Sequence, residues 1–206
     1  NESNDEAFID TNTLFCNISE ECVKNNDNKQ CESEDFTKKR IQESHRKNMI
    51  NEFENRFAEY TGSKYAIAVT SGTTALYMGL KSLGIGKGDE VIVPDITFVA
   101  TANSVLLTGA TPVIADVSED DMNISLDSIE RSITSRTKAV LPVHLAGNIC
   151  KMREIKKIAK ENNLFLIEDC AHAIGTKFNK KHAGTFGNAG CFSFYPTKNF
   201  TTIEGG

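Results

Sequence analysis

The feature that most constrains the fold of this chain is a regular alternation, after about residue 48, of short apolar runs with longer segments of helical character. Continuous apolar runs are typical of buried strands. The predicted strands are residues 65–69, 91–93, 112–117, 139–145 and 164–167, with a last strand that begins at Cys191 and stops at Pro196. Because strands that alternate with helices need crossover connections, the pattern predicts an α/β fold with a mostly parallel sheet flanked by helices.

Helices are predicted between these strands. Met49, Phe53, Phe57 and Tyr60 recur at helical spacing, and Gly62 is expected to end the helix that they define. Further helices are predicted for residues 75–83, 97–107, 126–133 and 152–162, and Ser125 is predicted to cap the third of these four.

The first 40 residues differ from the rest because they are rich in Asn, Asp, Glu, Lys and Ser. Few of their side chains could offset the entropy cost of ordering the chain. Residues 1–40 are therefore predicted to be a polar leader, either a loosely packed arm or disordered. Residues 41–206 are predicted to form one large domain.

Composition and charge argue against several classes of protein. With a formal net charge of −5 over 206 residues, the chain lacks the basic surface of a nucleic-acid-binding protein. No apolar run approaches the ~18 residues that a membrane span needs. The six cysteines follow no tight metal-binding spacing, so no metal site is expected and a reducing, cytoplasmic location is predicted. Three of them, Cys150, Cys170 and Cys191, lie beside apolar runs and are expected to be buried.

Three polar segments follow predicted strands. They are Ser71-Gly72-Thr73, Asp169, and the segment from Ser193 to Lys198. Ligands of open parallel sheets gather at the carboxyl ends of the strands. We therefore expect these three segments to lie close together and to form a site.

Lys198 lies just past the proline that stops the last predicted strand. A lysine fixed at the end of a buried strand can lose part of its hydration, which lowers the pKa of an ammonium group. Such a lysine can act as a nucleophile and form a Schiff base. A lone lysine in a loop is more often an ordinary solvated residue, so the interpretation depends on its neighbours.

The other two segments supply an anion site and a carboxylate. At the strand-to-helix turn, Gly72 permits close approach of a ligand and the helix N-terminus offers N–H groups to a phosphate, although a simple helix cap is the commoner explanation. Ser193 could add a hydroxyl donor. Asp169 would be a buried carboxylate, which needs a cation from a ligand or from the protein. His172 could orient a ligand oxygen or hydrogen-bond the backbone.

An anion site, a carboxylate and a lysine together match the needs of pyridoxal 5'-phosphate. This cofactor needs a site for its phosphate, a carboxylate that keeps its pyridine nitrogen protonated, and a lysine for the Schiff base. Motifs of competing chemistries are missing from the sequence, which has no phosphate-binding P-loop, no glycine-rich dinucleotide motif after a strand and no G-x-S-x-G elbow.

Several motifs between about Met49 and Gly206 resemble those of the DegT/DnrJ/EryC1/StrS aminotransferases, which modify sugars. They occur in order and with natural spacing: YAIAVTSGTTAL (65–76), GDEVIVP (88–94), TFVATAN (97–103), GATPV (109–113), IEDCAHAIG (167–175) and FSFYPTKN (192–199). The resemblance implies the large domain of the aspartate-aminotransferase-like fold, fold type I, truncated before its small C-terminal domain. Ile203 departs from the family pattern, in which glycine is common at that position.

The resemblance also implies roles for single residues that bind pyridoxal phosphate. Lys198 falls at the Schiff-base lysine, Asp169 at the partner of the pyridine nitrogen, and His172 near the phenolic oxygen. The remaining matches are Phe98, which would stack on the ring, and Gly72, Thr73 and Ser193, which would contact the phosphate.

The implied function is transfer of an amino group, usually from glutamate, to a ketone on a nucleotide-linked deoxy sugar, by a homodimer with shared sites. A dehydratase of the same family is disfavoured, because those relatives replace the lysine at the position of Lys198. The alternative of another class is a non-catalytic sugar-nucleotide-binding relative or an inactive fragment. The family pattern continues beyond Gly206, so this chain is expected to be a fragment with unpaired strand edges that aggregates or binds the cofactor poorly.

Overall fold

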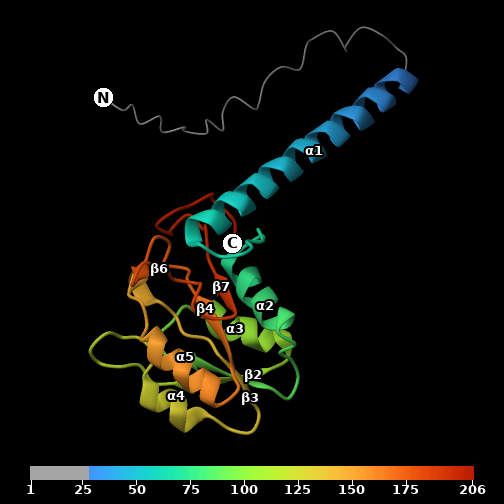
Figure 1. Cartoon of the computed structure of the whole chain (residues 1–206). Coiled ribbons are helices and arrows are strands. Elements are labelled where there is room, and N and C mark those ends of the chain that lie inside the picture. Colours follow the sequence, from blue (N-terminus) through green and yellow to red (C-terminus); the bar gives the residue numbers. More distant parts are fainter. Residues whose placement is uncertain (1–27) are drawn as a thin grey trace, which may run out of the picture. The chain divides into compact units, whose positions relative to one another are not determined.

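The computed structural model describes residues 28–206, which form two compact units divided between Lys47 and Asn48 (Figure 1). Helix α1, Asn28–Thr61, runs through this division. The predicted start of the first helix at Met49 is therefore wrong. The segment before Met49 is rich in Lys, Arg, Glu and Gln, which favour a helix even without an apolar stripe. Residues 1–27 lie outside the described residues, and a polar leader over residues 1–40 stays a prediction.

The larger unit alternates strands and helices in the predicted order. One sheet contains β1 Glu90–Pro94, β2 Thr111–Ala115, β3 Thr137–Val140, β4 Phe165–Asp169 and β7 Ala189–Cys191. Its strand order is β2-β1-β3-β4-β7, and every neighbouring pair is parallel, which confirms the predicted sheet. The short strands β5 Lys177–Phe178 and β6 Lys181–His182 form a separate antiparallel hairpin. The helices are α2 Gly72–Ser82, α3 Ala100–Thr108, α4 Leu126–Ser132 and α5 Met152–Glu161, with a short 3-10 turn, η3 Leu145–Gly147.

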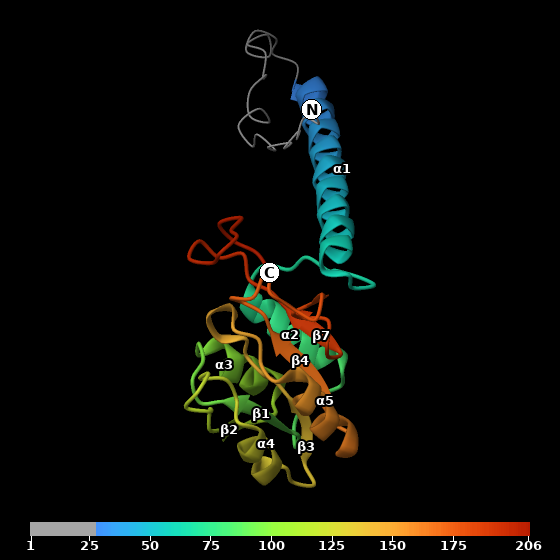
Figure 2. The same cartoon turned by 60° about the vertical axis from the view of Figure 1, so that its left-hand side comes forward.

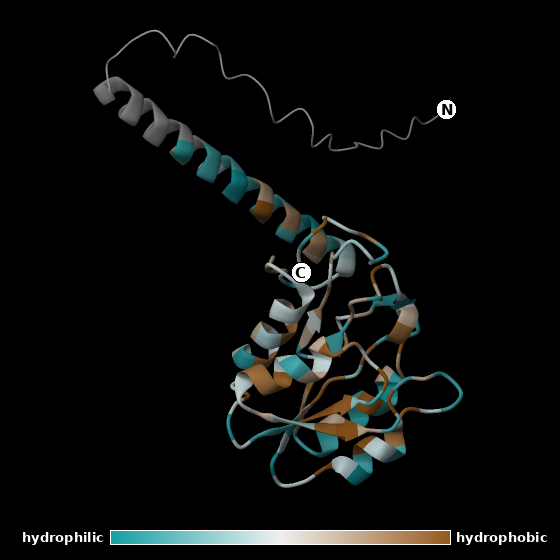
Figure 3. Ribbon diagram, turned by 180° about the vertical axis from the view of Figure 1, so that it is seen from behind, coloured by the Kyte–Doolittle hydropathy of each residue, from teal (hydrophilic) through white to brown (hydrophobic). Residues whose placement is uncertain are grey.

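Helices cover both faces of the sheet because its strands bury residues on both sides (Figures 1 and 2). Val91 and Val93 belong to a core cluster that also contains Leu76 and Leu80 of α2 and Val105 of α3. The residues that alternate with them, Ile92, Val140 and Leu166, pack instead with Ile129 of α4 and Ile155 and Ile158 of α5. Figure 3 shows these hydrophobic strands enclosed between the helices. Cys150, Cys170 and Cys191 are all buried, as predicted.

The ends of two helices follow the predicted chemistry. Ser125 caps α4, since its side chain accepts a hydrogen bond from the Ser128 N–H. Gly62 follows the last residue of α1 with a φ of 75°, a conformation that favours glycine. Within residues 28–206, no helix is both long and apolar enough to cross a bilayer.

Three predicted strands differ from the structure. The strand predicted at residues 139–145 is observed as β3 but ends at Val140, shortly before Pro142, which has no N–H to give to a ladder. Residues 65–69 are not a strand, because no other strand of the described chain lies beside them to form a ladder; Val69 exchanges two backbone hydrogen bonds with Gly206, at 2.8 and 3.0 Å. The last strand ends at Cys191 and does not reach Pro196. Beyond it the backbone of Phe194 pairs with a loop, accepting from Thr202 N–H and donating to the Gly205 carbonyl.

Candidate active site

All seven residues that the sequence singles out line one cavity of about 670 Å³: Gly72, Thr73, Phe98, Asp169, His172, Ser193 and Lys198. The cavity lies where β1, β3, β4 and β7 end, and its walls come from the segments that follow these strands and from the first turns of α2. A ligand site at the carboxyl ends of parallel strands is the arrangement expected of such a sheet. The structure thus brings together segments that are up to about 125 residues apart in the chain, from Gly72 to Lys198.

Asp169, the last residue of β4, is a buried carboxylate that forms no ion pair with any of the described residues. Its Oδ2 accepts a hydrogen bond from Thr101 Oγ1 at 2.8 Å, and its Oδ1 accepts one from the Ala171 N–H at 3.1 Å. Within residues 28–206, no ion pair involves Asp169. Burial raises the pKa of Asp169, whereas the Ala171 N–H, the Thr101 hydroxyl and the charge of Lys198 lower it. Such a carboxylate has spare acceptor capacity for a cationic ligand.

Lys198 and His172 form a second polar pair at the cavity. The Lys198 Nζ lies 3.0 Å from His172 Nε2, and both side chains are half-buried. Burial lowers the pKa of His172, and the positive charge of Lys198 lowers it further, while Asp169 acts in the opposite direction. A neutral imidazole can accept a hydrogen bond from an ammonium group at Nε2, which places its own proton on Nδ1.

The anion site is built from the N-terminus of α2 and from Ser193. The Ser71 side chain caps α2 by accepting a hydrogen bond from the Thr74 N–H at 3.1 Å. The first N–H groups of a helix have no partner within the helix, so Gly72 and Thr73 can offer theirs to an anion. A Cβ on Gly72 would lie only 2.7 Å from the Cβ of Ser193. Glycine is therefore required for the helix to approach the buried Ser193 hydroxyl.

Phe98 stands on the wall of the cavity in the turn before α3, with 70% of its surface exposed. A ring so exposed in the described chain has a face available for a planar ligand. Stacking of this kind contributes about 0.5–1.5 kcal/mol beyond the burial of area.

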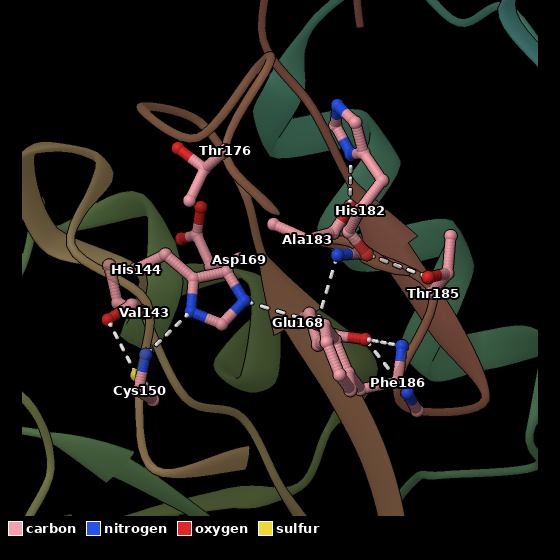
Figure 4. Close-up of polar contacts among 12 residues, drawn as sticks. Val143, His144, Cys150, Glu168, Asp169, Thr176, His182, Ala183, Thr185 and Phe186 are labelled. Carbon is pink, nitrogen blue, oxygen red and sulfur yellow. Dashed lines mark hydrogen bonds and ion pairs between the residues drawn. The ribbon is translucent and has the colours of Figure 1, made fainter. Parts of the chain in front are cut away.

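The sequence analysis missed a buried network directly behind Asp169 (Figure 4). Glu168 is fully buried, and its carboxylate accepts hydrogen bonds from three backbone N–H groups of a glycine-rich turn and one from His144 Nε2. The His144 Nδ1 accepts from the Cys150 N–H, so the ring is neutral with its proton on Nε2. The three turn donors are the N–H groups of Gly184, Phe186 and Gly187.

This network holds the end of β4 in place. The backbone N–H of His144 also donates to the carbonyl of Asp169, at 3.1 Å. Cys170 lies close enough to His144 and Glu168 for the three to resemble a metal-binding group. The hydrogen bonds already described occupy the His144 and Glu168 ligand atoms, and burial raises the pKa of the Cys170 thiol well above its ordinary value. We therefore interpret the cluster as structural. Only the acidic pair Glu168-Asp169 at the end of an apolar run could have indicated it from sequence.

The fold and the site define a class of protein, the fold-type-I pyridoxal-phosphate enzymes. The sequence model of the DegT/DnrJ/EryC1/StrS aminotransferase family matches residues 27–206, and the chain belongs to this family.

Three comparisons illustrate the relationship. The chain is 48% identical over 159 residues to the GDP-perosamine synthase of Escherichia coli O157:H7, a match that covers 77% of this chain and 44% of that protein. It is 46% identical to the solved aminotransferase from Psychrobacter cryohalolentis, with a TM-score of 0.75 over 76% of this chain and 40% of the other. It is 34% identical to Spr1654 of Streptococcus pneumoniae, solved in a pyridoxal-phosphate form, with a TM-score of 0.72 over 76% and 44% of the two chains. The chain thus spans less than half the length of these relatives.

The residues of the cavity fit the cofactor of this family. The buried Asp169 has no ion-pair partner among residues 28–206, and the cofactor's pyridinium nitrogen would be a suitable cation. A Cβ at Gly72 would close the gap between the α2 N-terminus and Ser193, where a phosphate would be held. Lys198 lines the same cavity. We conclude that the chain carries the donor set that pyridoxal phosphate requires.

Proposed function

We propose that this chain is the cofactor-binding part of an aminotransferase that moves an amino group from glutamate to the ketone of a nucleotide-linked deoxy sugar. The observation that carries the proposal is the juxtaposition, in one cavity, of Lys198 with a buried Asp169 that has no cationic partner among the described residues. When bound, pyridoxal phosphate supplies an electrophilic carbon and a ring that withdraws electrons from it.

Asp169 would bind the cationic nitrogen of the cofactor ring. In the buried site the ionised carboxylate is unfavourable, and a cation beside it relieves that cost. Gly72, Thr73 and Ser193 would hold the phosphate, and Phe98 would lie against the ring. These contacts would hold the cofactor at its phosphate and at its ring nitrogen, within the cavity that Lys198 also lines.

Lys198 would serve as nucleophile and as the group that moves a proton to and from the substrate carbon. The neutral His172, 3.0 Å away, can accept a proton or a hydrogen bond from the Lys198 Nζ. A lysine must be unprotonated to act as a nucleophile, and an acceptor at this distance helps to hold its lone pair toward the cavity. We expect His172 to orient the amino group.

The substrate class is supported by relatives whose names refer to sugar nucleotides, GDP-perosamine synthases among them. A retained Lys198 favours amino transfer over dehydration. Homodimer formation and a cytoplasmic location belong to the same proposal, and the exposed apolar side chains beside the cavity, such as Phe98 and Val99, are compatible with a partner subunit.

The test is to express the intact protein with pyridoxal phosphate, reduce it with borohydride and map the labelled peptide by mass spectrometry. We expect a pyridoxyl group on Lys198 in wild type and none at that position in Lys198→Arg. Lys181→Arg, which changes an exposed lysine of β6, is the matched control and should keep the label. Folded wild-type protein without a label on Lys198 would refute the proposal and favour a non-catalytic relative.

The donor and acceptor need a separate measurement. Single-turnover spectra of the loaded protein should change on addition of glutamate, and the aminated protein should return to its first spectrum on addition of a nucleotide-linked keto sugar. If Lys198 is labelled but neither spectral response occurs, the cofactor assignment would stand and the assigned reaction would be refuted.

A further inference from the structure

Two threonines connect the cavity to the buried side of Asp169. Thr101, in the first turn of α3, is fully buried, and its Oγ1 lies 2.8 Å from Asp169 Oδ2. The Oγ1 of Thr97 lies 2.7 Å from that of Thr101. Thr97 is half-buried and lines the cavity, so the three side chains form a continuous chain from the cavity wall to the carboxylate.

The direction of the hydrogen bonds follows from the chemistry of the groups. An ionised carboxylate only accepts hydrogen bonds, so the Thr101 hydroxyl must donate its proton to Asp169. The Thr101 oxygen can then accept the proton of Thr97. Hydroxyl groups linked in this way polarise one another, which strengthens the bond to the carboxylate.

The Thr101 hydroxyl acts on one oxygen of Asp169, and the Ala171 N–H acts on the other. Two donors from opposite sides fix the plane of the carboxylate, while each oxygen keeps acceptor capacity for a ligand. Burial opposes ionisation of Asp169, and the Thr101 hydroxyl is one of the groups that favour it. None of the described residues forms an ion pair with Asp169, so the two neutral donors contribute much of the stabilisation of its ionised form.

We propose that Thr101, supported by Thr97, is a positioning residue that keeps Asp169 ionised and oriented so that it can hold the pyridine nitrogen of the cofactor in its protonated form. The inference rests on the proposed function, because it requires that the cavity binds pyridoxal phosphate. It assigns a role to Thr101, for which the sequence alone predicted none.

The test measures the protonation of the ring nitrogen directly. Intact protein is loaded with pyridoxal phosphate labelled with 15N in the ring, and the 15N chemical shift distinguishes the protonated from the unprotonated nitrogen. In wild type we expect the protonated shift. In Thr101→Val, which replaces the hydroxyl by a methyl group of similar shape, we expect a shift toward the unprotonated form and cofactor binding weaker by about tenfold or more, as expected for a lost hydrogen bond to a charged group.

Two variants separate the hydroxyl from general packing. Thr101→Ser keeps the hydroxyl and should restore the wild-type 15N shift. Thr108→Val is the matched control, because Thr108 is a buried threonine of the same helix whose hydroxyl donates to the Val105 carbonyl and accepts from the Ala110 N–H, neither of which lines the cavity. It should leave the 15N shift unchanged. If Thr101→Val does not fold, Thr101→Ala removes the same hydroxyl without crowding the site and takes its place.

The outcomes distinguish the two proposals. A wild-type protein that binds no cofactor would overturn the proposed function and this inference with it. A wild type that binds the cofactor, together with a Thr101→Val or Thr101→Ala variant whose ring nitrogen stays as protonated as in wild type, would overturn the inference alone. A shift in Thr108→Val as large as in Thr101→Val would also overturn it, because the effect would then belong to the packing of α3.

Discussion

Replacing Gly72 by alanine should damage both the fold and the anion site. Gly72 is the first residue of α2, and a Cβ there would lie 2.7 Å from the Ser193 Cβ, 3.0 Å from the Ser193 Oγ and 3.3 Å from the Phe192 carbonyl oxygen. Carbon atoms pack at about 3.5–4.0 Å, so the new methyl group overlaps Ser193 by roughly 1 Å. The N-terminus of α2 must move away from Ser193 to relieve the overlap.

The expected loss of stability is about 1–2 kcal/mol. Overpacking of a well-packed site costs about 1–3 kcal/mol, and the better helix propensity of alanine offsets up to about 1 kcal/mol of it. Because the same movement widens the gap between the α2 N–H groups and the Ser193 hydroxyl, cofactor affinity should fall as well.

The assay is urea unfolding of the cofactor-free intact protein, followed by titration with pyridoxal phosphate. A double-mutant cycle locates the clash. Ser193→Ala retains the Cβ and should not reduce the cost of Gly72→Ala, whereas Ser193→Gly removes it and should. Gly79→Ala is the control in the same helix, since its new Cβ would meet nothing closer than the Cys191 Sγ at 3.3 Å, and we expect a change within about 1 kcal/mol. Equal unfolding of Gly72→Ala and wild type, or equal rescue by both Ser193 variants, would refute this reasoning.

Three further changes have defined outcomes. Asp169→Asn should raise the urea midpoint of cofactor-free protein at neutral pH. Burial raises the pKa of Asp169, so its ionisation destabilises the fold as the pH rises above the ordinary carboxyl pKa of about 4. The gain in midpoint should vanish in acid, and an equal gain at both pH values would contradict the assignment. Glu168→Gln should lower the free energy of unfolding in urea by roughly 2–5 kcal/mol. The four donors now share two carboxylate oxygens, and glutamine would replace one of these acceptors with an NH2 group that cannot accept a hydrogen bond. A loss of unfolding free energy below about 1 kcal/mol would show that the network is not rigid. Ile203→Gly should raise the midpoint, since Ile203 has a φ of 73°, which strains a β-branched residue. An unchanged or lowered midpoint would argue that no strain is stored there.

Local pattern predicted most of the fold. The apolar runs indicated β1, β3 and β4, because these strands bury residues on both faces and so leave a continuous hydrophobic signal. They also indicated β2, an edge strand on which Ile114 is exposed. The rule that ligands bind at the carboxyl ends of parallel strands then predicted that Gly72, Asp169 and Lys198 lie together. They do line one cavity, although residues 65–69 before Gly72 are not a strand.

The errors arose where a segment depends on a distant partner. Residues 65–69 have the composition of a strand, but a strand needs a neighbour, and composition does not show whether one is present. The last strand was predicted too long because Phe192 and Phe194 are buried by packing against Phe53 and Phe57 of α1, without a ladder.

The sequence missed His144, Glu168 and Thr101 for the same reason, because each depends on a partner that is distant in the chain. His144 and Glu168 are 24 positions apart, and Thr101 and Asp169 are 68 apart. Each pair forms because the fold places two distant strands or helices side by side, and neither pair corresponds to a sequence motif. The seven residues that line the cavity could be predicted because the chemistry of one ligand links them, whereas the residues behind them are brought together only by the folded chain.

The side-by-side acids at the end of β4 give the chain a safeguard against misalignment. Glu168 and Asp169 point to opposite sides of the strand, one to the glycine-rich turn and one to the cavity. A slip of β4 by a single residue in one direction would place Asp169 among the four donors that Glu168 now meets and Cys170 at the position of Asp169; a slip in the other direction would place Ile167 among those donors and Glu168 at the position of Asp169. In the first case the shorter side chain would have to reach all four donors, and in the second case the donors would have no acceptor. A misaligned chain would leave buried donors without acceptors, so its fold would be less stable than the correctly aligned one. This cost disfavours an inactive but folded protein.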